Sequence, residues 1–204
     1  MGNVFSEQAK VELYSQQLRS TQQFGPSEER VIESYKKTTS FEFLDQMLYV
    51  YTKQWLPDDL LLKADKMTMA HSLELRVPFL DHSLVEFVAA SPVNMKMRKH
   101  KNGEFITKYM FRKAFEGRLP EEILHRKKLG FPVPLNGLFK GELRTLAEDV
   151  FNSRSFRDTG LFDISKLMDM LRQHNSGVDM SAKLWSLLVF AMWQERFKVV
   201  CAYG

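Results

Sequence analysis

Helix-start and helix-stop residues recur along the whole chain, whereas the alternating pattern of a β-strand is nearly absent. Apolar residues return three or four positions apart in segment after segment, and Ser, Asp, Pro or Gly stand at the ends of these segments. This spacing is typical of amphipathic α-helices, and these residue types are typical of helix ends. The sequence therefore predicts a mainly α-helical chain, without repeats or low-complexity tracts.

Four helices are expected in the first part of the chain. Ser6 is a candidate N-cap for the first, the second begins within 26–29, and the third follows Ser40. Pro57 precedes two aspartates, which predicts the start of a fourth helix running to about Ser72. Proline suits the first turn of a helix, and carboxylates there stabilise the positive end of the helix dipole.

The segment from Leu75 to Pro78 is expected to be extended, because the residue before a proline avoids helical dihedral angles. The last predicted helix is apolar on almost all sides, which favours a buried position. Met67, Met69 and Phe79 are also assigned to the core. The helices expected after the extended segment cover residues 81–90, 104–116, a short stretch from 120, 139–151, 163–174 and 181–197.

Positive charge is concentrated in one segment. The 204 residues carry 29 Lys and Arg against 25 Asp and Glu, a net charge of +4. Lys96 to Lys128 alone holds eleven basic and four acidic residues, a local +7, so the rest of the chain sums to −3. The segment is interpreted either as a solvated helix face or as a site for a polyanion, with nucleotide phosphates and nucleic acid as the two candidates.

Several kinds of site have no sequence signature here. The chain has no glycine-rich phosphate loop, no G-x-S-x-G motif, and no metal-ligand spacing among its five histidines and Cys201, so no metal site is expected. A single cysteine cannot form an internal disulfide, which favours a reducing cytosol. The longest nearly apolar run, Leu184 to Trp193, is about half of the roughly 20 residues that a membrane span needs. We expect a cytoplasmic protein without self-contained catalysis.

Three segments carry the remaining chemistry. The first, residues 56–81, reads L-P-D-D-L-L-x-K-x-D-K-x-x-M-A-x-S-L-E-x-R-V-P-F-L-D. The second, residues 108–115, is a basic aromatic stretch that reads K-Y-M-F-R-K-A-F. The third, residues 119–135, reads L-P-x-x-I-L-x-R-x-K-x-G-F-P-V-P-L. Its two prolines and Gly130 exclude regular structure around Lys128.

In these motifs and their order, the chain resembles the synthetase domain of the glutamine-dependent asparagine synthetase family. The resemblance covers nearly the whole chain. It implies that residues 1–204 are the C-terminal, mainly α section of an α/β ATP-pyrophosphatase domain, similar to adenine nucleotide α-hydrolases. The family's S-G-G-x-D-S pyrophosphate loop and its N-terminal glutaminase cysteine are not in this sequence. We therefore expect a fragment or one piece of a split protein, which is inactive by itself.

The resemblance also implies a reaction and its participants. The family uses ATP and Mg²⁺ to adenylate the side-chain carboxylate of aspartate, releases pyrophosphate, and lets ammonia from glutamine attack the acyl-adenylate. The implied partners are the remainder of the synthetase, a glutaminase domain and small-molecule substrates, and a second copy of the chain is a further candidate. Neither a membrane nor nucleic acid is an expected partner, and no ATP or Mg²⁺ is expected on this chain alone.

Lys128 is the candidate catalytic residue that the resemblance implies. The matching lysine of the family reaches the α-phosphate and pyrophosphate, where a compact ammonium on a flexible stem suits shifting phosphate charge. The alternative is that Lys128 is a solvated charge on a connector. Lys108 matches a second basic position that faces pyrophosphate, and its alternative is an exposed helical lysine near Glu104 at i,i+4.

Five further residues line the substrate cleft in the family: Lys63, Asp65, Lys66, Glu74 and Arg76. The alternative for Arg76 is an ion pair with a carboxylate that braces the fold. Two other functions stay open for the whole chain. One is a related ligase with another acceptor, such as a β-lactam synthetase or another amidotransferase, and the other is a non-catalytic, basic helical binding module.

Overall fold

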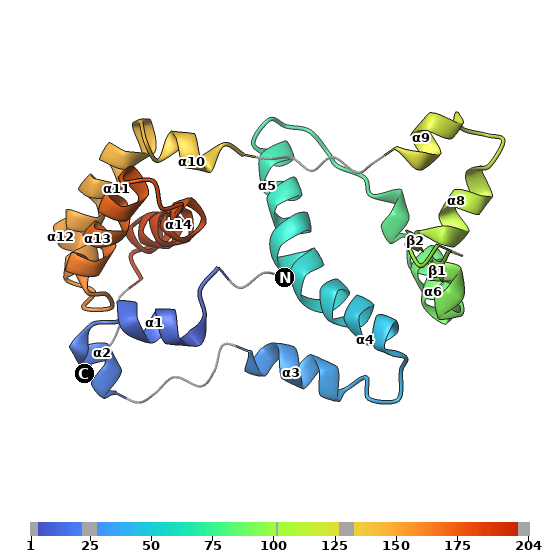
Figure 1. Ribbon diagram of the computed structural model, residues 1–204, viewed down its shortest axis with the longest axis horizontal. Helices are drawn as coiled ribbons and strands as arrows, with labels where there is room; N and C mark the ends of the chain where they lie inside the picture. The colour runs from blue at the N-terminus through green and yellow to red at the C-terminus, as the bar shows by residue number, and fades with distance from the viewer. Residues whose placement is uncertain (1–3, 22–27, 101, 127–132, 200–204) are drawn as a thin grey trace. The chain divides into compact units, whose positions relative to one another are not determined.

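The computed structural model describes residues 4–21, 28–100, 102–126 and 133–199, and it is mainly helical, as predicted (Figure 1). The chain divides into two compact units. The first unit combines Met1–Ser27 with Gly130–Gly204, and the second is the continuous segment Glu28–Leu129.

The first unit is built from helices at both ends of the sequence. Asp163 caps α13 by accepting a hydrogen bond from the Ser165 N–H over 3.1 Å, and this confirms the helix start predicted there. The helix predicted over 139–151 instead begins at Glu142, because residues just before it form a short helix of their own. The helices are α1 (Glu7–Leu13), α2 (Gln16–Ser20), α10 (Leu135–Leu138), α11 (Glu142–Asn152), α12 (Arg154–Arg157), α13 (Ile164–Asn175) and α14 (Ser181–Phe197).

A continuous apolar core holds the first unit together. Helices α11, α12 and α13 pack against α14, and each contributes residues from one face. Burial of such side chains is the main source of stability in a domain of this size. The core contains Leu13, Phe139, Ala147, Phe151, Phe156, Leu167, Met170, Leu171, Leu184, Leu187, Leu188 and Ala191.

The N-terminal helices join this core through the backbone. The Asp163 N–H donates to the carbonyl of Leu13, and the Ser15 N–H donates to the carbonyl of Leu161, both over 2.9 Å. Ser15 also caps α2, since its hydroxyl accepts from the Leu18 N–H over 3.0 Å. The chain therefore turns at Ser15, and this turn separates α1 from α2.

Helix α14 is buried on one face only, although its apolar composition predicts burial all round. Its inner face lies in the core, whereas Trp185, Val189, Met192, Trp193 and Phe197 are exposed. Successive positions are four, three, one and four residues apart, so all five lie on one broad outer side of the helix.

The second unit consists of helices and one small hairpin. Asp81 caps α6 by accepting from the Leu84 N–H over 3.2 Å, and Ser91 ends this helix, as predicted. The elements are α3 (Glu29–Lys36), α4 (Phe43–Val50), η1 (Tyr51–Leu61), α5 (Leu62–Met69), η2 (Pro78–Leu80), α6 (His82–Ala90), α7 (Val93–Lys96), β1 (Met97–Lys99), β2 (Phe105–Thr107), α8 (Tyr109–Phe115) and α9 (Glu121–His125).

Pro57 lies inside a helix, so the predicted helix start at this residue is wrong. Helices α4, η1 and α5 follow one another without a break, and Figure 1 shows α4 and α5 as the ends of one helix. The middle part is a π-helix, in which the Leu62 N–H reaches the Pro57 carbonyl five residues earlier. This wider turn accommodates a residue that has no N–H to donate, so the helix continues through the proline.

The basic helix predicted over 104–116 is shorter than expected. Phe105, Ile106 and Thr107 instead form β2, which pairs antiparallel with β1 in the register Met97 to Thr107 and Lys99 to Phe105. An aromatic and two β-branched residues in succession favour an extended backbone, and the pairing with β1 decides between strand and helix. Gly117 has a φ of 71° just after α8, the left-handed conformation in which glycine commonly ends a helix.

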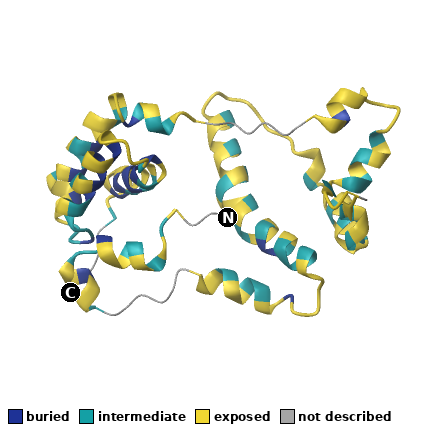
Figure 2. Cartoon of the chain, viewed as in Figure 1, coloured by how far each residue is buried: buried dark blue, intermediate teal, exposed yellow. Residues whose placement is uncertain are grey.

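Few side chains of the second unit are buried. Among its described apolar residues only Val50 and Leu124 are buried, and in Figure 2 its elements are mostly yellow and teal, whereas the dark blue gathers in α11 to α14. Met67, Met69 and Phe79 are 61%, 57% and 64% exposed, so their assignment to the core is wrong for this structure. Phe79 instead contacts Phe111 of α8 at the surface, with ring centroids 5.5 Å apart.

Candidate functional site

Three of the predicted cleft residues lie on helix α5, as the sequence indicates. Lys63 is exposed and pairs with Asp59 one turn earlier over 3.4 Å. Asp65 and Lys66 are also exposed, and their side chains make no hydrogen bond or ion pair with any described residue. A single surface pair at i,i+4 contributes only about 0.3–0.5 kcal/mol, so all three charges can reorient toward a ligand.

Glu74 and Arg76 follow in the extended segment between α5 and η2. Nη2 of Arg76 lies 2.5 Å from Oε1 of Glu74, and the two side chains are 84% and 71% exposed. An ion pair between near neighbours in solvent joins no two elements, so this pair does not brace the fold. The structure therefore places Lys63, Asp65, Lys66, Glu74 and Arg76 along one exposed stretch, from α5 to the start of η2.

Lys108 lies between the last residue of β2 and the first residue of α8. Its backbone is left-handed, with φ 55° and ψ 37°, which is uncommon for a residue other than glycine, asparagine or aspartate. Lys108 is exposed, as its predicted alternative states, but the helical placement beside Glu104 is wrong because residues 105–107 are a strand. Glu104 instead accepts a hydrogen bond from Asn102 over 2.8 Å. No described residue forms a hydrogen bond or ion pair with the Lys108 ammonium.

The candidate catalytic residue Lys128 lies outside the described residues, together with Lys127 and Gly130–Pro132. Within the part of the chain that the structure describes, no hydrogen bond or ion pair joins Lys108 to the α5 stretch.

Several basic side chains of the segment 96–128 bind other groups within the second unit. Lys96 is 6% exposed and lies 2.6 Å from Asp45. The Arg98 guanidinium lies 4.9 Å from the ring centroid of Tyr109 and donates to its hydroxyl. Lys113 pairs with Glu116, and this hydrogen bond raises the pKa of the lysine.

Arg112 connects three elements of the same segment. Its Nε donates to the Thr107 carbonyl over 3.1 Å, and its Nη1 donates to the Leu124 carbonyl. The guanidinium therefore ties α8 to the end of β2 and to α9 through two main-chain carbonyls.

Sequence reasoning missed the structural role of Asp45. The residue stands in the otherwise largely apolar helix Phe43–Val50, without a basic residue three or four positions away. A carboxylate in such a helix is a usable signal, since it indicates a partner from elsewhere in the chain.

Among the described residues, no group of three or more His, Cys, Asp or Glu side chains is arranged to hold a metal ion. No helix within the same ranges is both long enough and apolar enough to cross a membrane.

A comparison with protein families tests the predicted family resemblance. The model of the asparagine synthase family matches residues 3–195 of this chain. The chain belongs to the asparagine synthase family. All the predicted site residues, including Lys108 and Lys128, fall inside the matched range.

Curated relatives of the asparagine synthase family extend far beyond the matched region. Glutamine-hydrolyzing asparagine synthetase 1 of Bacillus subtilis (strain 168) is 39% identical over 162 residues, which cover 79% of this chain and 24% of the relative. Asparagine synthetase 3 of the same strain is 47% identical over 87 residues, 43% of this chain and 13% of its own. The Gallus gallus enzyme is 47% identical over 72 residues, 34% of this chain and 12% of its own.

The chain therefore spans about a quarter of the length of the first of these relatives. No solved structure matches it.

Proposed function

We propose that this chain is the C-terminal helical section of the synthetase part of an ATP-dependent amide-forming ligase. The match to the asparagine synthase family over residues 3–195 carries the proposal. In this proposal the section belongs to an α/β ATP-pyrophosphatase domain of a cytoplasmic enzyme. The sheet, the pyrophosphate loop and a glutaminase domain belong to other parts of that enzyme.

The proposed reaction forms asparagine from aspartate. The side-chain carboxylate of aspartate attacks the α-phosphate of ATP, and pyrophosphate leaves. Ammonia, released from glutamine as glutamate forms, then attacks the activated carboxyl carbon, and AMP leaves.

Positively charged side chains among the described residues are suited to bind the phosphates of a nucleotide. Lys108 at the start of α8 and Lys66 on α5 each present an ammonium that no described residue binds. Lysine binds phosphate as a mobile point charge, which suits a group whose charge moves during the reaction. In the proposal Lys128 stabilises the α-phosphate and pyrophosphate, and Lys108 contacts pyrophosphate.

A magnesium ion bound with the nucleotide would need only one or two carboxylates from the protein. Mg²⁺ in nucleotide sites is usually held by one or two carboxylates together with the phosphates. Asp65 is exposed near Lys66 on α5, so it is available to such an ion or to an ammonium group of a substrate. MgATP would supply the adenylyl group that activates the carboxylate when it is bound.

Arg76 and Glu74 are proposed to act on the amino acid. Both are exposed and bound only to each other among the described residues, so a ligand can replace either partner at low cost. The Arg76 guanidinium suits a carboxylate, with which it forms two parallel hydrogen bonds. Glu74 suits an amino group.

The exposed apolar surface of the second unit supports the proposed partners. Among its described residues, six large apolar side chains are at least 60% exposed: Phe43, Met67, Leu73, Phe79, Phe87 and Phe105. Apolar surface on this scale is typical of a region that packs against other protein. Because the chain covers 24% of its first relative, we propose that the remainder of the synthetase covers this surface.

The alternative of a basic nucleic-acid-binding module has less support. Lys96, Arg98, Arg112 and Lys113 are engaged within the second unit, so the segment presents less free charge than its sequence suggests. Binding of nucleic acid that depends on phosphate contacts requires cations free to replace counterions. Weak binding to DNA at low salt is therefore expected.

A chimeric enzyme tests the proposed function directly. In this experiment, the matched 162-residue segment of Bacillus subtilis asparagine synthetase 1 is replaced by the corresponding segment of this chain. We expect aspartate-dependent release of pyrophosphate from ATP with ammonia as the nitrogen source. Pyrophosphate release that requires a different carboxylate acceptor would instead assign a related ligase. Loss of synthetase activity while glutaminase activity persists would contradict the proposal.

Two lysine variants of the chimera test the individual roles. Lys128→Ala should lower pyrophosphate release by about 10²- to 10³-fold, because an electrostatic contact to the transition state contributes about 3–4 kcal/mol. Lys108→Asn keeps a residue that tolerates the left-handed backbone and removes the charge. It should lower the rate by about tenfold. Lys36→Gln, an exposed lysine of α3, is the matched control and should leave the rate unchanged.

A further inference from the structure

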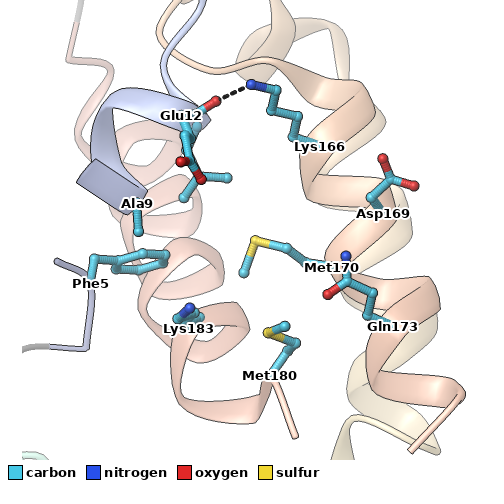
Figure 3. Close-up of a pocket in the computed structure, with 10 residues that line it drawn as sticks. Phe5, Ala9, Glu12, Lys166, Asp169, Met170, Gln173, Met180 and Lys183 are labelled. Atoms are coloured by element: carbon cyan, nitrogen blue, oxygen red, sulfur yellow. Dashed lines mark hydrogen bonds between the residues drawn. The ribbon is translucent and has the colours of Figure 1, made fainter. Parts of the chain in front are cut away.

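A groove on the first unit lies between α1 and α13, with the first turn of α14 at one end (Figure 3). Its volume is about 220 Å³. The proposed synthetase residues all belong to the second unit, whereas the residues of this groove belong to the first. It is lined by apolar Phe5, Ala9, Leu13, Met170 and Met180, and by polar Glu12, Lys166, Asp169, Gln173 and Lys183.

The carboxylates of the groove already have partners. Oε1 of Glu12 accepts a hydrogen bond from the Gln8 side chain over 3.1 Å. Asp169 forms an ion pair with Arg172, three residues further along α13. Both acidic groups are therefore partly satisfied by neighbours on their own helices.

The two lysines of the groove have no such carboxylate partner. Lys166 donates to the main-chain carbonyl of Glu12, as the dashed line in Figure 3 shows. Nζ of Lys183 lies 5.7 Å from the centroid of the Phe5 ring, and neither lysine forms an ion pair with a described residue. Both side chains are half-buried, so an anion at either ammonium is less screened by water than at an exposed lysine.

We propose that this groove binds a small carboxylic acid with an aromatic body. The carboxylate pairs with Lys183, and the ring lies on Met170 and Met180 beside Phe5. Thioethers and aromatic rings make favourable contacts with a further ring. A volume of about 220 Å³ is below the roughly 300–1,000 Å³ of pockets for drug-sized ligands, so one ring with a short acidic chain fits it.

Titration of the full chain with 3-phenylpropionate tests this proposal, and the neutral 3-phenylpropionamide is the matched ligand. NMR spectra of methyl-labelled methionine report on the groove, because Met170 and Met180 both line it. We expect saturable shifts of these two methyl signals, with the acid binding about fivefold tighter than the amide. Absence of shifts at both methyl groups, or equal affinity for acid and amide, would overturn the proposal.

Three variants distinguish the contribution of the Lys183 charge from that of the room in the groove. Lys183→Gln should remove the preference for the acid and leave binding of the amide unchanged. Ala9→Leu should abolish the binding of both ligands, because Ala9 points into the groove and leucine fills it without disfavouring the helix. Lys140→Gln, an exposed lysine of the same unit outside the groove, should keep the fivefold preference. Retention of that preference in Lys183→Gln would overturn the assigned role of Lys183.

Discussion

Nζ of Lys96 lies 2.6 Å from Oδ1 of Asp45, and this ion pair joins α7 to α4. The ammonium is almost fully buried and also donates to the Ala89 carbonyl over 2.8 Å. A buried ammonium that loses its carboxylate remains desolvated and largely uncompensated. The pair therefore contributes substantially to the stability of the second unit, which buries few apolar side chains.

Asp45→Asn should lower the free energy of unfolding of the second unit by about 2 kcal/mol, the scale for a hydrogen bond to a charged group. Urea unfolding followed by Trp55 fluorescence measures it, in a background where Trp185 and Trp193 are replaced by Phe. The exposed pair of Asp59 and Lys63 is the control, and Lys63→Gln should change the free energy by less than about 0.5 kcal/mol. Equal effects of the two variants would refute a special role for Lys96.

In the first unit, the buried side chain of His174 links helices through hydrogen bonds, as the Lys96–Asp45 pair does in the second. It is 1% exposed, and its Nδ1 accepts from the Met180 N–H over 3.2 Å, while its Nε2 lies 3.0 Å from the Asn136 carbonyl. Because Nδ1 accepts, the neutral ring carries its proton on Nε2 and donates it to Asn136. One side chain thus links α13 to α10 and to the start of α14.

His174→Phe keeps an aromatic ring and leaves both backbone groups without their partner. We expect a loss of about 2–3 kcal/mol in the free energy of unfolding, because each buried unsatisfied group costs about 1–3 kcal/mol. Fluorescence of Trp185 and Trp193 in a Trp55→Phe background follows this unit. His125→Gln, at an exposed position of α9, should be neutral within about 0.5 kcal/mol. Unchanged stability in His174→Phe would contradict this account.

The sequence predicts the elements whose ends are marked by local side chains. Asp81, Asp163 and Gly117 mark helix ends by capping or backbone conformation, and the structure confirms each. The predictions at Pro57 and at Phe105–Thr107 are wrong, because a π-helical turn and a pairing across a hairpin depend on residues further along the chain.

In the candidate site too, the features that depend on local residues could be predicted, and those that depend on distant protein surfaces could not. The stretch from Lys63 to Arg76 lies on a helix and the chain after it, so its placement could be predicted from local signals. The exposure of Met67 and Phe79 could not, since an apolar residue in a motif does not reveal which protein surface covers it. Lys128 stays a prediction, because it lies outside the described residues.

The pKa of Asp179 is lowered to about 2, chiefly by its hydrogen bond with Ser181 and then by one with Asn136. A carboxyl group whose pKa is lower in the folded chain stabilises the fold when it is ionised. Its contribution is complete above the ordinary value of 3.8 and is lost as the pH falls through about 2. Asp179→Asn should therefore be less stable than the unmodified chain at pH 5, and this difference should shrink toward pH 2. Urea unfolding of both proteins between pH 5 and pH 2 measures it, and a difference that stays constant over this range would contradict the shift.

The contrast between the cores of the two units predicts different rates of amide hydrogen exchange. Helices α13 and α14 surround a core of twelve buried residues, whereas only Val50 and Leu124 are buried apolar residues among those described in the second unit. Opening of a helix costs less free energy when it uncovers less buried apolar surface, so its amides exchange faster.

We expect amides of α13 and α14 to exchange at least about 100-fold more slowly than those of α5 and α9 in the same 204-residue chain, a difference of about 2.7 kcal/mol in opening free energy. Hydrogen exchange followed by mass spectrometry resolves both regions. In the synthetase chimera, where the remainder of the enzyme is present, α5 should gain protection and α13 should change little. Equal protection of α5 in the chain and in the chimera would show that the exposed apolar side chains around Met67 are not covered by the rest of a synthetase.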